Sequence, residues 1–245
     1  MVDLNILLNF IGMVFETFII VISVVLLVLI IKKYLIKRHN LTRLLLIIFI
    51  CYLIAIMFSW LSKVFVFAQI GIVQDGSIVA WMYNLVKDFR LSEFFVTIAI
   101  FLSYVLKVNV FEKGYNTLQK YVVIVFGIFA CVYVLFIYES GSTLLDIIAF
   151  LIVFVYMVMV YAPFLRRSIE AYRRTDEKVY KQAFLSLAVM SLSFMLIFLN
   201  FAIDRVLIFL GSPGFTVFYF LAWISAIVGI FGTYYGYIKP KASEK

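Results

Sequence analysis

Nine polar or charged residues interrupt otherwise apolar stretches of this sequence, and their side chains are the ones most able to do chemistry. They are Glu16, Asn84, Lys87, Asp88, Arg90, Glu93, Asn200, Asp204 and Arg205. Within a helix, Asn84 shares a face with Asp88, and Arg90 with Glu93, because residues three or four apart are neighbours. Their mixed signs predict a polar site that either binds a small zwitterionic ligand or forms an internal network of ion pairs.

The stretches that carry these residues have the composition of membrane helices. Of the 245 residues, 66% are apolar and 14% are charged, whereas a soluble domain carries roughly 25% charged residues. This composition excludes an ordinary soluble globule and a disordered chain. Because a membrane-spanning helix needs ~20 mostly apolar residues, we expect an all-α integral membrane protein, a single seven-helix transmembrane bundle over residues 1–245. The expected spans are 6–31, 44–67, 78–108, 121–138, 144–165, 182–210 and 215–238.

The distribution of basic residues predicts the orientation of this bundle. Most of the 21 Lys and Arg residues lie in the loops after the first, third and fifth spans and in the C-terminal tail. The connecting segments on the other side, 68–77, 139–143 and 211–214, contain no Lys or Arg. Basic residues concentrate on the cytoplasmic side of membrane proteins. We therefore predict an external N-terminus and a cytoplasmic C-terminus in a multi-pass protein of the plasma membrane.

Helix geometry places two of the acidic side chains below the outer membrane boundary. With a rise of 1.5 Å per residue, Glu16 lies about 6 Å and Glu93 about 9 Å inside, while Lys63 and Asp146 fall at the boundary itself. The charges of span 78–108 cover too wide an arc for a helix that faces lipid. We therefore expect one long, central helix there, with its first turns above the membrane. The hypothesis is a polar pocket in the outer half of the bundle, lined by the nine residues named first.

Composition also limits the chemistry of the site. The chain has one histidine, His39, and two cysteines, Cys51 and Cys131, which lie in apolar runs. Histidine is the commonest metal ligand and general base, so we expect no metal, no cofactor and no catalytic residues. An enzyme is the least favoured class, although an acid centred on Glu93 stays open. We assign the net charge of +8 to membrane topology and not to nucleic-acid binding.

This sequence lacks the defining motifs of two large seven-helix families. Microbial rhodopsins carry a Schiff-base lysine in the seventh helix, and span 215–238 contains no lysine. G-protein-coupled receptors end helix 3 with an acidic-Arg-Tyr motif and carry NPxxY in helix 7. The corresponding segments here read SYVLK over 103–107 and GTYYGY over 232–237, so neither motif is present.

Two other segments resemble a third group. A basic loop runs into a Leu-rich helix over 38–46 (RHNLTRLLL), and the last span runs from Leu221 through Gly229 to Pro240. Both are similar to the seven-helix sensory module found at the N-terminus of many prokaryotic histidine kinases. In that family a signalling domain follows the last helix, whereas five residues follow Pro240 here. The resemblance implies a sensor-like bundle whose output passes through a separate partner.

These observations favour a receptor-like or sensor-like module for signal transduction, with a small-molecule ligand in the outer pocket. Its basic inner loop, 166–181, would engage anionic lipid of the bilayer or a cytoplasmic or membrane protein partner, or would merely fix the orientation. The runner-up is a small-solute transporter or channel subunit, which needs polar residues down to the inner face. Below Glu93, span 78–108 offers only Thr97 and Ser103. A third reading is a structural subunit whose outer charges pair between subunits.

Overall fold

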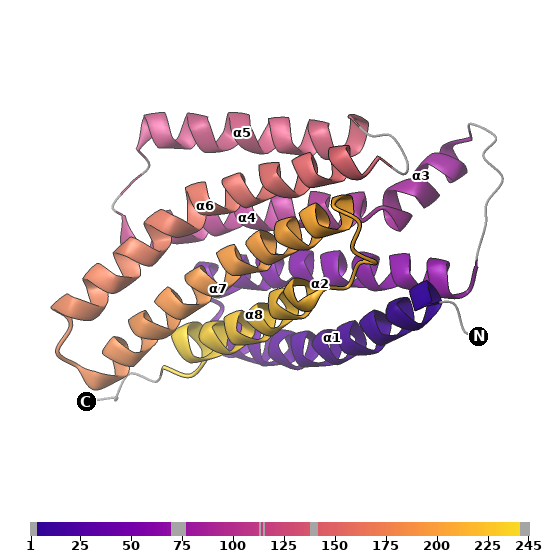
Figure 1. Cartoon of the computed structure of the whole chain (residues 1–245). Coiled ribbons are helices and arrows are strands. Elements are labelled where there is room, and N and C mark those ends of the chain that lie inside the picture. The colour runs from indigo at the N-terminus through magenta and orange to yellow at the C-terminus, as the bar shows by residue number, and fades with distance from the viewer. Residues whose placement is uncertain (1–3, 70–76, 113, 115, 138–141, 241–245) are drawn as a thin grey trace.

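A computed structural model describes residues 4–69, 77–112, 114, 116–137 and 142–240, and this part of the chain folds as helices without a strand. Figure 1 shows the helices side by side as an elongated bundle. The helices are α1 (Leu4–Lys37), α2 (Asn40–Phe67), α3 (Ile78–Lys87), α4 (Arg90–Phe111), α5 (Thr117–Phe136), α6 (Thr143–Arg174), α7 (Lys178–Phe209) and α8 (Val217–Thr233), followed by a π-helical turn (Tyr234–Ile238).

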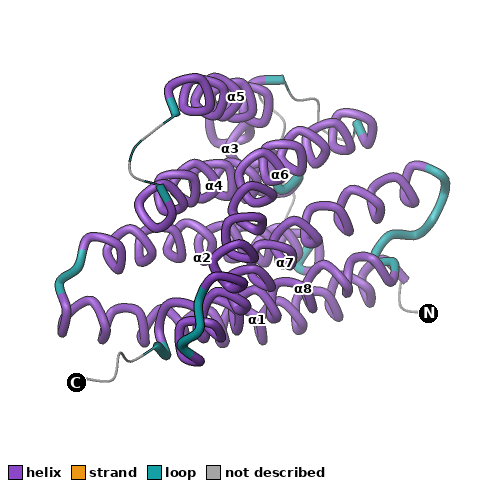
Figure 2. Tube along the Cα trace, turned by 90° about the vertical axis from the view of Figure 1, so that its left-hand side faces the viewer, coloured by secondary structure: helices purple, strands orange, loops and turns teal. Residues whose placement is uncertain are grey.

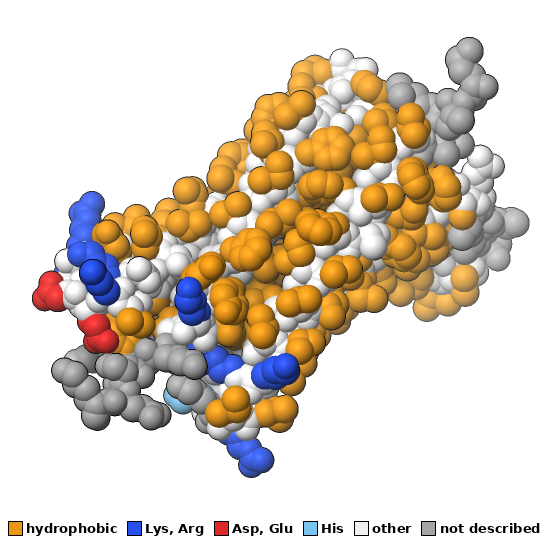
Figure 3. Space-filling model, turned by 90° about the horizontal axis from the view of Figure 1, so that it is seen from below, with side chains coloured by type: hydrophobic (Ala, Val, Ile, Leu, Met, Phe, Trp, Pro, Cys, Tyr) orange, Lys and Arg blue, Asp and Glu red, His pale blue; other side chains and the backbone are white. Residues whose placement is uncertain are grey.

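Seven of these helices are long and apolar enough to cross a membrane, and α3 is the short exception. Large apolar side chains such as Phe18 on α1 and Val125 on α5 are exposed on the outside of the bundle. Seen from below, hydrophobic side chains cover the middle of the molecule, while Lys and Arg gather at the end that holds the C-terminus (Figure 3). An apolar exterior of this kind suits lipid. The expected all-α, seven-helix membrane architecture is therefore confirmed.

The structure differs from the sequence-based expectation in the region 78–108, which is two helices and not one long helix. Helix α3 ends at Lys87 and α4 begins at Arg90, and Phe89 between them has a left-handed backbone with φ 64°. The amide of Asp88 still donates to the carbonyl of Asn84, at 3.0 Å. A left-handed residue turns the chain out of the helical path, so α3 leaves the axis of α4 (Figure 1).

The basic segment 166–181 is likewise more helical than expected. Helix α6 continues to Arg174 and α7 begins at Lys178, so three residues form the connection. Arg173 and Arg174 occupy the last turn of α6, where cations interact favourably with the negative end of the helix dipole. The expected loop is therefore mainly the extended tips of two helices.

Helix α4 is the central element, in contact with α2, α5 and α6, while α5 lies at the edge of the bundle (Figure 2). Helices α6, α7 and α8 pack in sequence order. Gly229 and Gly232 on α8, and Gly236 in the π-helical turn, allow a close approach to α7. A Cβ on Gly232 would lie 2.9 Å from the carbonyl oxygen of Ser186. Small residues at helical spacing allow this approach of two backbones in lipid.

Candidate functional site

Seven charged residues gather at the end of the bundle that holds the N-terminus, which we call the outer end after the predicted orientation. They come from five helices, α1, α2, α4, α6 and α7. We name them the outer charged cluster: Glu16, Lys63, Arg90, Glu93, Asp146, Asp204 and Arg205. Five of the seven are buried, so their charges must be compensated within the protein.

The pair formed by Glu16 on α1 and Lys63 on α2 is almost completely buried, with 0% and 1% of the side chains exposed. Their Oε1 and Nζ atoms lie 2.7 Å apart. The hydroxyls of Ser59 and Tyr219 each donate a hydrogen bond of 2.9 Å to the same carboxylate oxygen. Because these partners come from α1, α2 and α8, one carboxylate joins three helices.

The ring of Phe89 contacts two cations of the cluster. The Lys63 Nζ is 4.6 Å from the ring centroid, and the Arg205 guanidinium carbon is 4.9 Å from it. Cations at such distances from an aromatic face are attracted by its quadrupole. The break between α3 and α4 therefore places the Phe89 ring next to both Lys63 and Arg205.

Arg90 and Glu93 on α4 form the second centre of the cluster. The Arg90 guanidinium lies 2.7 Å from Oδ1 of Asp146 and 3.7 Å from Oε2 of Glu93. Glu93 is 2% exposed, and neither of its carboxylate oxygens accepts a hydrogen bond from any residue that the structure describes. Buried carboxylates are nearly always hydrogen-bonded, so Glu93 has unused capacity to bind a donor.

Asp204 has a different role, because it stabilises the connection between α7 and α8. One of its oxygens accepts hydrogen bonds from the backbone amide of Thr216, at 2.9 Å, and from the Thr216 hydroxyl, at 2.7 Å. Thr216 in turn caps the first turn of α8. The carboxylate is therefore already used within the protein.

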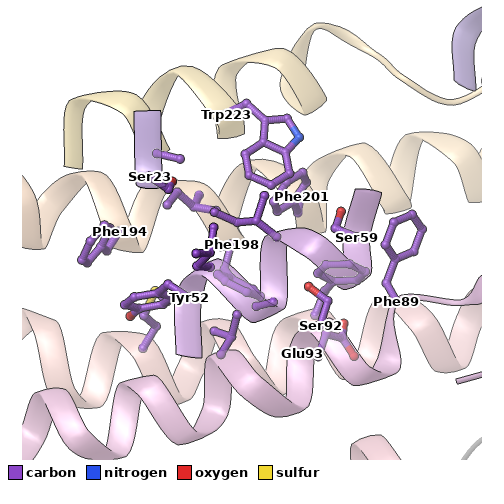
Figure 4. A pocket seen from close by; sticks show the side chains of 18 of the residues that line it. Ser23, Tyr52, Ser59, Phe89, Ser92, Glu93, Phe194, Phe198, Phe201 and Trp223 are labelled. Carbon is purple, nitrogen blue, oxygen red and sulfur yellow. The ribbon is translucent and has the colours of Figure 1, made fainter. Parts of the chain in front are cut away.

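An elongated cavity extends inward from the cluster, between α1, α2, α4, α6, α7 and α8. Figure 4 shows Ser59, Ser92 and Glu93 at one end, and Tyr52 and Phe194 at the other. The cavity volume, counted as the space that the centres of water-sized spheres can reach, is about 90 Å³. A single water needs roughly 10–15 Å³ on the same scale, so the cavity has room for more than one water. The walls are mainly apolar, so the cavity combines a charged outer end with a hydrophobic body.

A small network of hydroxyl groups lies at the inner end of this cavity. The hydroxyls of Tyr52 and Tyr161 lie 2.9 Å apart, and Tyr161 donates to Ser103 at 2.8 Å. Ser103 donates to the carbonyl of Ala99 on its own helix. These groups satisfy one another inside the bundle and need no solute.

Five of the nine residues expected in the pocket belong to the outer charged cluster, and the other four do not line the cavity. Glu16, Arg90, Glu93, Asp204 and Arg205 belong to the outer charged cluster; among these five, Glu93 and Arg205 line the cavity. Lys87 is exposed, and the side chains of Asn84, Asp88 and Asn200 are half-buried. None of these four lines the cavity, because α3 turns away from α4 and Asn200 does not reach the lining.

Sequence reasoning missed several members of the site. It placed Lys63 and Asp146 at the membrane boundary, where long or charged side chains usually reach water. A usable signal was present for Lys63, since Ser59 lies one turn away and Glu16 supplies the opposite charge at similar depth. Phe89 and Tyr219 gave no signal, because an aromatic residue in an apolar stretch is most simply a packing residue.

The described residues contain no group of three or more His, Cys, Asp or Glu side chains that could hold a metal ion. The site is therefore composed of ion pairs, hydroxyls and aromatic rings around an apolar cavity. Comparison of this chain with protein-family models, with curated proteins and with solved structures finds no match in any of the three.

Proposed function

We propose that this protein is a receptor-like or sensor-like module of the plasma membrane, with an external N-terminus and no catalytic activity. It holds a small amphipathic molecule in the cavity below the outer charged cluster. The observation that carries this proposal is the polarity of the cavity: charge at the outer end, apolar walls along the body and hydrogen-bonded hydroxyls at the inner end. Ligand sites are typically concave and apolar, with a few polar groups that fix orientation.

The position of the cavity supports a signalling role. Six helices line it, so a bound molecule contacts all of them and favours the helix arrangement that fits it best. Helices α6 and α7 line the cavity and continue to the basic inner tips around 166–181. Movement of these two helices is the route by which binding would reach a separate protein partner or anionic lipid at the inner surface. This scheme agrees with the resemblance to kinase sensory modules.

The interior below Glu93 favours a receptor over a transporter. The hydroxyls of Thr97 and Ser103 both donate to backbone carbonyls four residues earlier. Ala99 and Ile100, which lie between them on α4, are completely buried and apolar. A solute that left the inner end of the cavity would meet a hydrophobic barrier.

The ion pairs also reduce the case for a purely structural subunit. Glu16 pairs with Lys63 and Arg90 pairs with Asp146 inside one chain, each at 2.7 Å. Charges that are compensated internally do not require a neighbouring subunit. These two ion pairs therefore need no neighbouring subunit to compensate them.

Two-sided cysteine labelling in liposomes tests this proposal. The background replaces Cys51 and Cys131, and Ser92→Cys places a thiol at the polar end of the cavity. Leu210→Cys, at a 73% exposed outer position, and Arg166→Cys, at an 82% exposed inner position, serve as the two side controls. We expect a membrane-impermeant reagent to label Leu210→Cys and Ser92→Cys from outside only, and Arg166→Cys from inside only.

The other results would overturn the proposal in different ways. Labelling of Ser92→Cys from both sides would replace the receptor with a transporter. No labelling of Ser92→Cys from either side, with both controls reacting, would show a packed structural cluster. Reversal of the two controls would contradict the orientation.

A further inference from the structure

The outer charged cluster contains one more carboxylate than cation among the described residues that define it. Its carboxylates are Glu16, Glu93, Asp146 and Asp204, and its cations are Lys63, Arg90 and Arg205. The nearby Lys87 and Asp88 cancel each other and leave this balance unchanged. A buried layer with one uncompensated negative charge is unfavourable. Without a ligand, a proton on one carboxylate removes this charge, and the positive charge of a bound ligand would compensate the carboxylate in place of that proton.

Glu93 is the carboxylate of the cluster with the least compensation from nearby cations and hydrogen-bond donors. Glu16 and Asp146 have cations at 2.7 Å, and Asp204 has two hydrogen bonds from Thr216. Among the residues that the structure describes, the cation paired with Glu93 is Arg90 at 3.7 Å, and that guanidinium lies closer to Asp146. Both oxygens of Glu93 are buried and accept no hydrogen bond from this described part of the chain, and the residue lines the cavity.

The surroundings of Glu93 suit a cation better than an anion. Arg205, the positive residue of the lining, has its guanidinium against the rings of Phe89 and Phe150, at 4.9 and 5.5 Å from their centroids. The cavity wall also contains Tyr219 and Trp223, whose aromatic faces attract ammonium groups. An ammonium in this cavity would therefore meet a carboxylate at Glu93 and aromatic rings elsewhere along the wall.

The body of the cavity defines the other half of the ligand. Along α2 the lining runs from Ser59 to Phe49, ten residues that correspond to about 15 Å of helix. The far end is aromatic and aliphatic, with Tyr52, Phe194 and Ile230. This length fits an extended alkyl chain or a flat apolar ring system.

We propose that the cavity binds a lipophilic monocation, an amine whose ammonium group donates to Glu93 and whose apolar part extends toward Phe194. This assignment rests on the proposed ligand-binding function and adds the chemical class of the ligand. Glu93 acts as the residue that selects for positive charge.

A matched set of three probes tests this assignment in nanodiscs of phosphatidylcholine. The probes are dodecylammonium, dodecanol and dodecanesulfonate, which share one chain and differ in head-group charge. Trp60→Phe and Trp81→Phe leave Trp223 as the single tryptophan, so its emission reports on occupancy of the cavity. A chain that retains Trp60 alone, which is outside the lining, controls for general partition into the bilayer.

We expect saturable changes in Trp223 emission with dodecylammonium, at least about tenfold weaker binding of dodecanol, and no saturable signal from dodecanesulfonate. Glu93→Gln should lower the affinity for dodecylammonium about tenfold or more, to the level of dodecanol. Glu170→Gln, the same change at a carboxylate outside the lining, should preserve the preference for the cation. Retained dodecanol binding by Glu93→Gln shows that this variant is folded.

The possible failures separate the two proposals. Equal binding of dodecanol and dodecylammonium, or a cation preference that survives Glu93→Gln, would overturn the ammonium assignment and leave the ligand-binding function in place. Tightest binding of dodecanesulfonate would overturn it in the same way. Absence of saturable binding by all three probes would remove the support for an amphipathic ligand in this cavity altogether.

Discussion

Two groups of opposite charges, at opposite ends of the bundle, show how differently the same interaction can act. In the outer charged cluster, the side chains of Glu16 and Lys63 are at most 1% exposed. At the inner end, Glu170 pairs with Arg166 and Arg167 at 3.0 and 3.1 Å, but the two arginines are 82% and 52% exposed. We call these three residues the inner surface triad. Distance is nearly the same in both groups, so solvent exposure decides their contributions.

The difference also separates two ways of holding membrane helices together. The outer end joins α1, α2 and α8 through polar groups around one carboxylate. Towards the inner end, α7 and α8 are held by the close approach of Gly232 and Gly236 to the neighbouring helix. Substitutions in each region should therefore fail for different physical reasons.

The largest effect is expected from Glu16→Gln. Gln retains the shape and can still accept from Ser59 and Tyr219, but it leaves the Lys63 ammonium buried without its counter-ion. Loss of one partner of a buried pair costs about 3–5 kcal/mol of stability. Reversible unfolding by SDS in mixed micelles, followed by circular dichroism, measures this loss.

The double variant Glu16→Gln with Lys63→Met sharpens the interpretation. Removal of both charges leaves no uncompensated ion, so most of the stability should return. If the double variant were no more stable than Glu16→Gln, the ion pair would not explain the loss. The comparison between the two ends would then lack its main support.

The second-largest loss of stability is expected from substitution of a packed glycine. A Cβ at Gly232 would lie 2.9 Å from the Ser186 carbonyl oxygen and 3.0 Å from the Met190 amide nitrogen. Backbone atoms cannot rotate away as a side chain can, so Gly232→Ala should cost about 1–3 kcal/mol. The same SDS titration checks this value. Gly114→Ala is the control, because no heavy atom lies within 4 Å of its Cβ position; equal losses from both would contradict the packing argument.

Hydropathy was sufficient to predict the seven-helix architecture of this bundle. Apolar segments of about 20 residues identify spanning helices, and seven such helices are present. The expectation that Glu16 and Glu93 face the interior of the bundle agrees with their burial. These features depend on length and local composition, which a sequence displays directly.

Pairing and backbone breaks could not be predicted in the same way. Lys63 looked like a residue that reaches water, because its partner Glu16 is on another helix and comes close only through packing. The break at Phe89 involves neither Gly nor Pro, the residues that usually mark such points. The cavity itself is space that the side chains of six helices leave unfilled, and no local pattern encodes that space.

The third effect concerns Asp204, where charge and hydrogen-bonding capacity can be separated. Asp204→Asn can still accept from Thr216 but loses the charge-assisted character of two short bonds. Charge-assisted hydrogen bonds are roughly twice as strong as neutral ones, so this change should cost about 1 kcal/mol. Asp204→Ala should be less stable than Asp204→Asn in the same titration. Equal stability of the two variants would show that the hydrogen bonds from Thr216 to Asp204 do not stabilise the connection between α7 and α8.

The smallest effect is expected in the inner surface triad. Glu170→Gln removes both of its ion pairs, yet unfolding at physiological salt should show no measurable change. The arginines are already solvated, and mobile ions screen exposed charges within about 8 Å at this ionic strength. Measurement of the unfolding midpoint at low and at physiological salt checks both parts of this argument. Suppose instead that Glu170→Gln lost as much stability as Asp204→Asn, and that salt did not change this loss. The distance between the charges, and not their solvent exposure, would then determine how much these ion pairs stabilise the protein. The outer and inner charges would then have to be treated alike.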